Sequence, residues 1–268
     1  MIIPYEPDYF PPAGNIISRI GRFVLLKFRN IGRAVEMTLE AFAFIPTLYK
    51  SREEISRQMF LAGAKSIGVT SIVALFTGMI LALQAGIILR DYGQEMKVGY
   101  LVAQTMFREM GPFMTALILA ASVGSAMAAQ IGTMAVSEEI AALDVMSINP
   151  VRFLVMPRLV ALLVMCPVLT AYTDFIGIFG GGFVAYTQLD VSWALYYENV
   201  RFLLYEKEIW VGMFKAIVFS ILVVGISCYE GMATKDGAVG VGRATRRAVV
   251  LSFLVILIVG YMITRLFY

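Results

Sequence analysis

Four ionisable side chains lie inside long apolar stretches of the sequence. Arg108 and Glu109 come shortly before Gly111-Pro112, and Asp174 and Lys215 lie in two later apolar stretches. A charge at the centre of a bilayer costs about 2.5 to 3.5 kcal/mol on the insertion scale, so each group should face protein, water or a polar headgroup. Adjacent helical residues point in different directions, so Arg108 and Glu109 cannot neutralise each other fully. We predict that Lys215 pairs with Glu109. These residues alone support a transport role and a packing ion pair about equally.

The sequence lacks the residues that several kinds of catalytic, metal and nucleotide site require. The chain has no histidine, and both cysteines, Cys166 and Cys228, lie inside apolar stretches. This composition argues against zinc sites, disulfide scaffolds and histidine-based catalysis. The string GAKS at Gly63 lacks the glycines of a G-x-x-x-x-G-K-[ST] phosphate loop, and no G-x-S-x-G is present. We therefore expect a chain that is not an enzyme, with no catalytic residue, metal or cofactor. Basic residues beside apolar stretches, with a net charge of +3, do not suggest nucleic-acid binding.

The polar segment 137–149 is a candidate partner-binding helix. Ser137 can cap a helix whose first turn carries Glu138 and Glu139, where carboxylates complement the helix dipole. Asn149-Pro150 is expected to stop it. One apolar stripe would follow its length, formed by Ile140, Leu143 and Met146. Such a stripe suits insertion into a groove on a soluble partner, although an ordinary connector helix is favoured on spacing alone.

A face of the first long apolar stretch carries residues at spacings of three and four: Leu81, Gln84, Ile88 and Tyr92. A mostly apolar face with one amide could line a path for acyl chains. Simple helix packing is the commoner role of such a face, and these residues alone favour packing.

The elements that must position these groups are membrane-crossing helices. The chain is 59% hydrophobic and only 15% charged, against roughly 25% charged residues in soluble domains. Apolar stretches of this length cross about 30 Å of hydrocarbon as single helices. Five spans are predicted, over about 63–89, 98–130, 153–185, 209–229 and 248–266. The fold class is therefore all-α integral membrane, with a kink expected at Gly111-Pro112 and a glycine-rich basic loop, MATKDGAVGVGRATRR, before the fifth span.

The transmembrane domain predicted from these spans covers residues 59–268, and other segments precede it or connect its spans. Residues 1–13 are proline-rich and expected to be extended, and 14–58 form an amphipathic helical region suited to the cytoplasmic membrane interface. Residues 190–208 should lie on the opposite, extracytoplasmic surface. Fifteen Lys and Arg residues flank the spans on the N-terminal side and five on the other. The positive-inside rule therefore predicts a cytoplasmic N-terminus and a periplasmic C-terminus.

Several stretches together resemble the MlaE/YrbE family of permeases, which work with MCE proteins. They are FTGMILALQ, FREMGPFMTALILAASVGSAMAAQIGTM, SEEIAALDVMSINPVRFLVMPRL, DFIGIFGGGFVA and GAVGVGRATRRAVVLSF. The resemblance implies a homodimer in a bacterial inner membrane that moves phospholipid. It also implies two cytoplasmic ABC ATPase subunits, which hold ATP and Mg, an MCE-protein oligomer outside, and sometimes a STAS-domain protein.

The resemblance also assigns roles to residues. Arg108 and Glu109, with Met110 beside them, match the family's charged pair in a central cavity, and Lys215 matches a position in the fourth span. The segment 138–150 becomes the coupling helix that the ATPase receives. Its coupling residues would be Glu138, Glu139, Ile140, Leu143, Asp144, Met146 and Asn149. The substrate path would add basic residues for phosphate, Arg243 and Arg247, and the first-span residues Leu81, Gln84, Ile88 and Tyr92.

Other functions remain open from the residues. An ion-coupled secondary transporter would relay protons or ions through Glu109, Lys215 and Asp174. A membrane-embedded lipid enzyme would need clustered acids or metal ligands at one membrane face, which the sequence does not offer. A purely structural assembly subunit is a third alternative.

Overall fold

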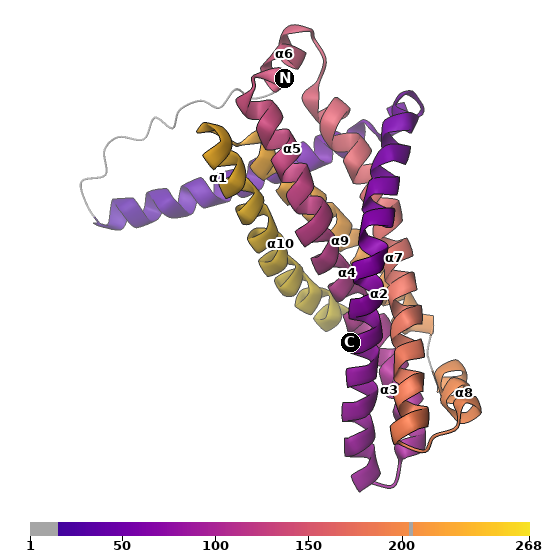
Figure 1. The fold of residues 1–268 in the computed structure, drawn as a ribbon. Coiled ribbons are helices and arrows are strands. Elements are labelled where there is room, and N and C mark those ends of the chain that lie inside the picture. The colour runs from indigo at the N-terminus through magenta and orange to yellow at the C-terminus, as the bar shows by residue number, and fades with distance from the viewer. Residues whose placement is uncertain (1–15, 204–205) are drawn as a thin grey trace.

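The computed structural model describes residues 16–203 and 206–268, and all regular structure within them is helical (Figure 1). The segment 1–13, expected to be extended, lies outside the described residues. Five helical stretches are long and apolar enough to cross a membrane. They are Arg52–Asp91, Glu95–Val136, Val151–Gln188, Glu206–Met232 and Gly237–Phe267. The prediction of an all-α integral membrane protein with about five spans is confirmed.

The last span is longer than predicted. Helix α10 runs over Gly237–Phe267, so residues 237–247 of the predicted basic loop are helical and only 233–236 connect α9 to α10. The prediction was wrong because Gly240, Ala244 and Ala248 recur every four residues and are buried, as a close helix contact requires. This small-residue stripe packs against α5, Ser125–Val136, and α9, Glu206–Met232.

The second span is a run of short helices joined by two π-helical turns. After η2, Glu95–Lys97, it comprises α3, Val98–Thr105; η3, Met106–Met110; α4, Gly111–Leu119; η4, Ala120–Gly124; and α5. The turns are η3 and η4. The irregularity expected at Gly111-Pro112 thus takes the form of a π-helical turn immediately before it. Such turns are rare and frequently lie at functional sites.

Helices α2, Arg52–Asp91, and α7, Met156–Gln188, form the most extensive helix pair and run side by side in Figure 1. Glycines allow this approach: a Cβ built on Gly78 would lie 1.8 Å from the carbonyl oxygen of Gly177. A Cβ on Gly180 would lie 2.5 Å from the carbonyl oxygen of Leu75. The two backbones are therefore in direct contact, as small residues permit between membrane helices. A short π-helical turn, η5 Val151–Val155, precedes α7.

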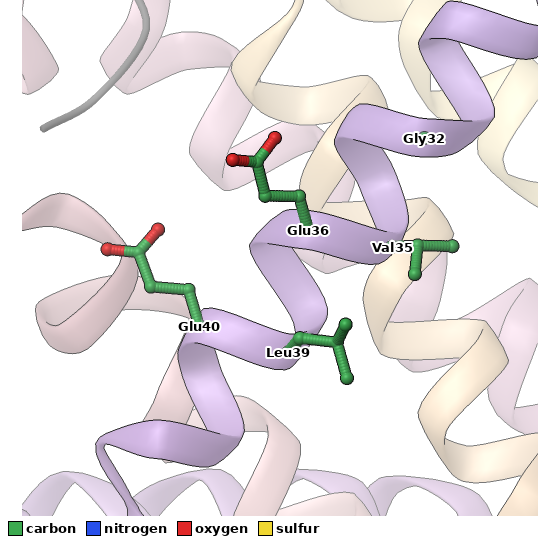
Figure 2. Close-up of a pocket in the computed structure, with 5 residues that line it drawn as sticks. All are labelled: Gly32, Val35, Glu36, Leu39 and Glu40. Atoms are coloured by element: carbon green, nitrogen blue, oxygen red, sulfur yellow. The ribbon is translucent and has the colours of Figure 1, made fainter.

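Helix α1, Ile16–Ala43, lies across the bundle instead of along it (Figure 1). One face exposes large apolar side chains: Leu25, Phe28, Ile31, Val35 and Leu39. Figure 2 shows Val35 and Leu39 on one side of α1 and Glu36 and Glu40 on the other, around a surface cavity of about 570 Å³. This arrangement is typical of a helix in the membrane interface. The 3₁₀ turn η1, Ile45–Ser51, then leads into α2.

Helix α8, Trp193–Leu203, packs against α3 and α7 at the end of the bundle opposite α6 (Figure 1). Tyr196 is fully buried there and donates a hydrogen bond to the carbonyl oxygen of Ile178 at 3.0 Å. The described part of the predicted surface segment 190–208 thus contains a helix anchored to the third span.

Candidate functional site

The predicted pair of Lys215 and Glu109 is present and forms the centre of the site. The Lys215 side chain is only 1% exposed, and its Nζ lies 2.8 Å from Oε2 of Glu109. Nζ also donates to the carbonyl oxygen of Arg108 at 2.7 Å and to Oγ1 of Thr264 at 2.8 Å. An ammonium group has three hydrogens, so Lys215 has an acceptor for each. This saturation is what a buried charge needs.

Pro112 explains why a backbone carbonyl is free to take part. In an α-helix the carbonyl of Arg108 would accept from the N–H of residue 112, but proline has none. The preceding π-helical turn is closed by the N–H of Gly111, which donates to the carbonyl of Met106. The carbonyl of Arg108 therefore remains available to Lys215 on α9. The proline at position 112 on the second span thus provides part of the binding site for the Lys215 ammonium group.

Glu109 is the partly accessible member of the pair, with 36% of its side chain exposed. Its second oxygen, Oε1, lies 2.8 Å from Oγ1 of Thr264. The Thr264 hydroxyl also lies 2.9 Å from the carbonyl oxygen of Gly260, and its one hydrogen can serve either acceptor. Arg108 approaches the same carboxylate only at 3.7 Å. Glu109 is therefore held mainly from α9 and α10, as the directions of adjacent helical residues require.

Arg108 has its own partner at the C-terminal end of the chain. Its guanidinium carbon lies 3.5 Å from the centroid of the Tyr268 ring, a cation–π geometry. The Tyr268 hydroxyl donates to Oε2 of Glu208, and Gln104 donates to Oε1 of Glu208 at 3.3 Å. Burial, and then the bond to Glu208, raise the pKa of Tyr268 to about 12. The hydroxyl therefore stays protonated near neutral pH and remains a donor.

An open groove of about 330 Å³ leads to the charged pair. Glu109, Lys215 and Thr264 supply its polar atoms. Its other walls are apolar and comprise Met110, Phe113, Phe219, Ile256, Leu257, Gly260 and Tyr261. A groove with one charged end and apolar walls can receive a molecule that has a polar head and an apolar body.

The predicted first-span face does not line this groove. Leu81 is half-buried and packs inside the bundle against Val98 and its neighbours. Gln84, Ile88 and Tyr92 are exposed on the surface of α2. The prediction placed Leu81 on one face with Gln84, Ile88 and Tyr92 because of their helical spacing. Helices α7 and α3 cover only the part of that face that holds Leu81.

The structure also separates the predicted basic residues from the groove. Arg243 and Arg247 are exposed near the start of α10, and Arg243 lies 3.7 Å from Asp236. Thr264 is near the other end of the same helix. At 1.5 Å per residue, Arg247 and Arg243 lie about 25 to 30 Å from Thr264 along the helix axis. The predicted proximity failed because the residues before 248 continue the helix instead of folding back.

Asp174 is buried at 1% exposure but is not bonded to the charged pair. Among the described residues its Oδ1 has no hydrogen-bond partner. The carboxyl group faces Gly111, where an added Cβ would lie 1.8 Å from Oδ1. Asp174 therefore contacts the backbone just after the π-helical turn η3, and the described structure contains no hydrogen-bonded chain from it to Lys215.

The predicted coupling segment contains helix α6, Glu139–Val145, which is shorter than predicted. Ser137 does not cap it, because its hydroxyl donates to the carbonyl of Thr133 at 2.9 Å or to Glu139. Left-handed residues at both ends set the helix length: Glu138 has φ of 61° and Ser147 has φ of 60°. The N–H of Ile148 donates to the carbonyl of Leu143 at 2.9 Å, which closes the C-terminal end.

The apolar surface of α6 also differs from the predicted stripe. Ile140 is half-buried and packs against the bundle core, and Leu143 is half-buried. Val145 and Met146 are the outward apolar residues, at 87% and 66% exposure. Three acidic residues of the same segment are also exposed: Glu138, Glu139 and Asp144. A helix of seven residues makes two turns, so only part of a three-residue stripe can face outward.

Asn149 starts the third span instead of ending α6. Its Oδ1 accepts from the backbone N–H of Val151 at 2.8 Å and of Arg152 at 3.2 Å, which would otherwise be unpaired at the helix start. Its Nδ2 donates to Oε1 of Glu40 on α1 at 2.8 Å. One side chain therefore joins the interfacial helix to the segment that follows α6.

Two replacements of Asn149 should separate these roles. Asn149→Ala removes the acceptor and should cost about 1 kcal/mol of stability, as the loss of a helix cap does. Asn149→Asp keeps the acceptor but removes the donor to Glu40. Hydrogen exchange should rise in α1 for both variants and at residues 151–152 for Asn149→Ala alone. Unchanged exchange in α1 would show that the bond to Glu40 does not hold that helix.

Sequence reasoning missed Thr264, Tyr268 and Glu208. Thr264 follows the buried stripe of α10 by one turn after Gly260, so a polar side chain at that spacing was the available signal. Nothing in the local sequence ties Tyr268 to Arg108, because 160 positions separate them.

Comparison with known proteins matches residues 55–266 to the permease family MlaE. The intermembrane phospholipid transport system permease protein MlaE of Haemophilus influenzae is 33% identical over 258 residues, covering 95% of this chain and 98% of that protein. A probable ABC transporter permease protein of Rickettsia conorii is 36% identical over 256 residues, with the same coverage. The chloroplastic protein TRIGALACTOSYLDIACYLGLYCEROL 1 of Arabidopsis thaliana is 31% identical over 212 residues, 79% of this chain and 61% of that protein. The chain described here belongs to the MlaE permease family.

Proposed function

We propose that this chain is the membrane-spanning subunit of an ABC-type transporter that moves phospholipids between the inner membrane and the outer envelope. The observation that carries the proposal is the groove that joins the Lys215–Glu109 pair to apolar walls, in a member of this permease family. A phospholipid has the matching combination of a charged phosphate and apolar tails. The Haemophilus relative is named for intermembrane phospholipid transport, which supports the same substrate class.

The contacts suggest different roles for the two cations. Lys215 has all three hydrogens directed at protein acceptors, so it holds Glu109 and the Arg108 carbonyl in place. Arg108 is 28% exposed and meets a carboxylate only at 3.7 Å, which leaves donors for another anion. A guanidinium group binds phosphate oxygens through paired hydrogen bonds. In this proposal Arg108, which adjoins the groove beside Glu109 without lining it, receives the phosphate, and Lys215 and Glu109 fix its position.

A homodimer would complete the groove. The groove opens beside α10, whose outer face exposes Leu257, Tyr261 and Met262. A partly exposed carboxylate facing hydrocarbon is costly, and Glu109 is 36% exposed in the single chain. A second copy packed against α10 would shield Glu109 and enclose the substrate between two such grooves. The small buried share of α2 and α10 relative to the other spans supports such an arrangement.

Helix α6 is the proposed contact for a cytoplasmic ATPase. Its exposed Val145 and Met146, with three exposed acidic residues in the same segment, suit a groove on a soluble partner. In this arrangement two ATPase subunits bind ATP and Mg, and their movement reaches the groove through the second and third spans that flank α6. The opposite end, with α8, then faces the periplasm and an MCE-protein oligomer, in a bacterial inner membrane. A STAS-domain protein would join on the ATPase side.

Replacing Val145 and Met146 together by serine should weaken ATPase binding about tenfold or more, because buried apolar anchors dominate such interfaces. Co-purification of the ATPase with the tagged permease from native membranes measures this. Val239→Ser is the matched control, since Val239 is 67% exposed at the start of α10. Equal ATPase recovery with both variants would remove α6 from the docking surface.

The direct test of function is phospholipid transfer by the reconstituted complex. Transfer of a fluorescent phospholipid should require ATP and the ATPase subunit, and should not respond to an ion gradient. Transfer driven by a gradient without ATPase would instead support the secondary-transporter alternative. Lys215 directs its three hydrogens at other acceptors and forms no hydrogen bond with Asp174 in the described residues, which weighs against that ion relay.

A further inference from the structure

A second groove lies on the bundle, at the π-helical turn η3 but lined by different residues from the charged groove. It has a volume of about 440 Å³ and is formed between η3, α7, α8 and α9. The residues that carry the argument are Phe107, Phe175, Ile178, Tyr197, Arg201 and Ile209. None of them lines the groove of Glu109 and Lys215. Phe107 of η3 lines this groove and Glu109 and Met110 of η3 line the other, so this turn contributes to both grooves.

The walls of this second groove are suited to an acyl chain. Phe175, in the third span, is 69% exposed, and Ile178 and Ile209 line the same hollow. Binding pockets for small molecules commonly have volumes of about 300 to 1,000 Å³ and mostly apolar walls with few polar groups. The shape and composition therefore fit a hydrocarbon chain lying against α7.

Arg201 gives the groove one charged end. It is exposed at the end of α8, and within the described residues its guanidinium group forms no ion pair or hydrogen bond, even with Glu198 one turn earlier. A guanidinium group beside an apolar hollow and without a carboxylate partner is suited to a phosphate group.

Aromatic side chains place this end of the groove at headgroup depth. Trp193 stacks on Tyr197 with ring centroids 5.8 Å apart and lies 6.1 Å from the Tyr186 ring. Trp210, next to Ile209, is 74% exposed. Trp and Tyr gather where hydrocarbon meets lipid headgroups. Because Tyr197 belongs to both the aromatic cluster and the groove, Arg201 lies where lipid phosphates are found.

We propose that the groove between η3, α7, α8 and α9 binds one anionic glycerophospholipid, with its phosphate on Arg201 and an acyl chain along Phe175 and Ile178. This site is separate from the charged groove at Glu109. The proposal requires only that the chain spans a membrane, so it does not depend on the proposed transport function. Phosphatidylcholine, whose headgroup has no net charge, should bind less well than an anionic lipid, because its own choline cation competes with Arg201 for the phosphate.

Photo-cross-linking with lipid identification tests this site. The full chain carries benzoylphenylalanine at Phe175 and is reconstituted in nanodiscs of phosphatidylcholine with a minority of phosphatidylglycerol. Mass spectrometry of the adducts should show phosphatidylglycerol enriched several-fold over its share in the membrane. The same label at Trp210, the exposed neighbour of Ile209, should capture the two lipids in their bulk proportions.

Arg201→Gln should abolish the enrichment at Phe175, and Arg90→Gln should leave it unchanged. Arg90 is a suitable control because it is an exposed arginine on α2 outside the groove. Thermal unfolding verifies that each variant is folded. We expect both to fold, because both arginines are exposed. Bulk proportions at Phe175, enrichment that survives Arg201→Gln, or adducts with a protein partner in the native complex would overturn the proposal.

Discussion

Lys215→Met should destabilise the protein by about 3 kcal/mol or more, the range for a broken buried ion pair. Methionine keeps the length and apolar volume of the side chain but removes the ammonium group. Glu109, the Arg108 carbonyl and Thr264 would each lose a donor that the structure directs at them within 2.8 Å. Thermal unfolding of the purified protein in detergent measures the loss. Thr264→Val, which leaves one ammonium hydrogen of Lys215 and one oxygen of Glu109 without this partner but keeps the ion pair, should cost less, about 1 to 3 kcal/mol.

The double variant Glu109→Gln/Lys215→Met separates packing from transport. Removing both charges eliminates the uncompensated carboxylate, so much of the stability should return. Phospholipid transfer by the reconstituted complex should nevertheless stay at least about tenfold below the unmodified protein, because the two groups that fix the position of Arg108 are gone. Recovery of transfer together with stability would show that the pair serves packing alone. Failure of stability to return would show that the pair is not the main interaction at Lys215.

Gly78→Ala should have the second large effect, a loss of about 3 kcal/mol or of the folded protein altogether. The new Cβ would lie 1.8 Å from the carbonyl oxygen of Gly177, and a backbone atom cannot rotate away as a side chain can. Helices α2 and α7 would have to separate, and overpacking of this kind typically costs about 1 to 3 kcal/mol or more. Thermal unfolding and the yield of monodisperse protein measure it.

Gly68→Ala is the matched control on the same helix. No atom lies within 4 Å of a Cβ built on Gly68, so alanine meets no clash there. Alanine is the better helix former by roughly 0.5 to 1 kcal/mol, and the control should be neutral or slightly stabilising. Similar unfolding temperatures for the two variants would mean that α2 and α7 do not pack as closely as described.

The long-range features most visible in the sequence were the spans and the ion pair. Apolar length identified five crossings, since a bilayer allows few other structures. The cost of a charge in hydrocarbon identified Lys215 as the partner of Glu109, because few other groups were available to neutralise it. Both predictions depended on the solvent, which acts on every residue in the same way.

The features that the sequence did not predict depend on backbone geometry and on which helices meet. Ser137 and Asn149 both have capping side chains, and only the left-handed turn at Ser147 decided that Asn149 begins the next helix. The glycines before position 248 permit a loop or a close helix contact equally well. Tertiary packing against α5 and α9 selected the helix. Tyr268 contacts Arg108 because α10 has the length and direction that bring its C-terminal end to the second span. The residues next to Tyr268 and Arg108 in the sequence do not indicate either property.

The π-helical turns η3 and η4 have a mechanical consequence. Each holds one more residue than an ordinary helical turn, and α4 lies between them. If such a turn tightens into α-helix, the residues on one side rotate by about 100° relative to the other, since each residue occupies that angle. The span would still cross the membrane as one continuous helix, but the side chains of Arg108 and Glu109 would point in a new direction around the helix axis. A helix that contains such an extra residue can therefore rotate a charged pair while the helix itself stays packed against the neighbouring helices.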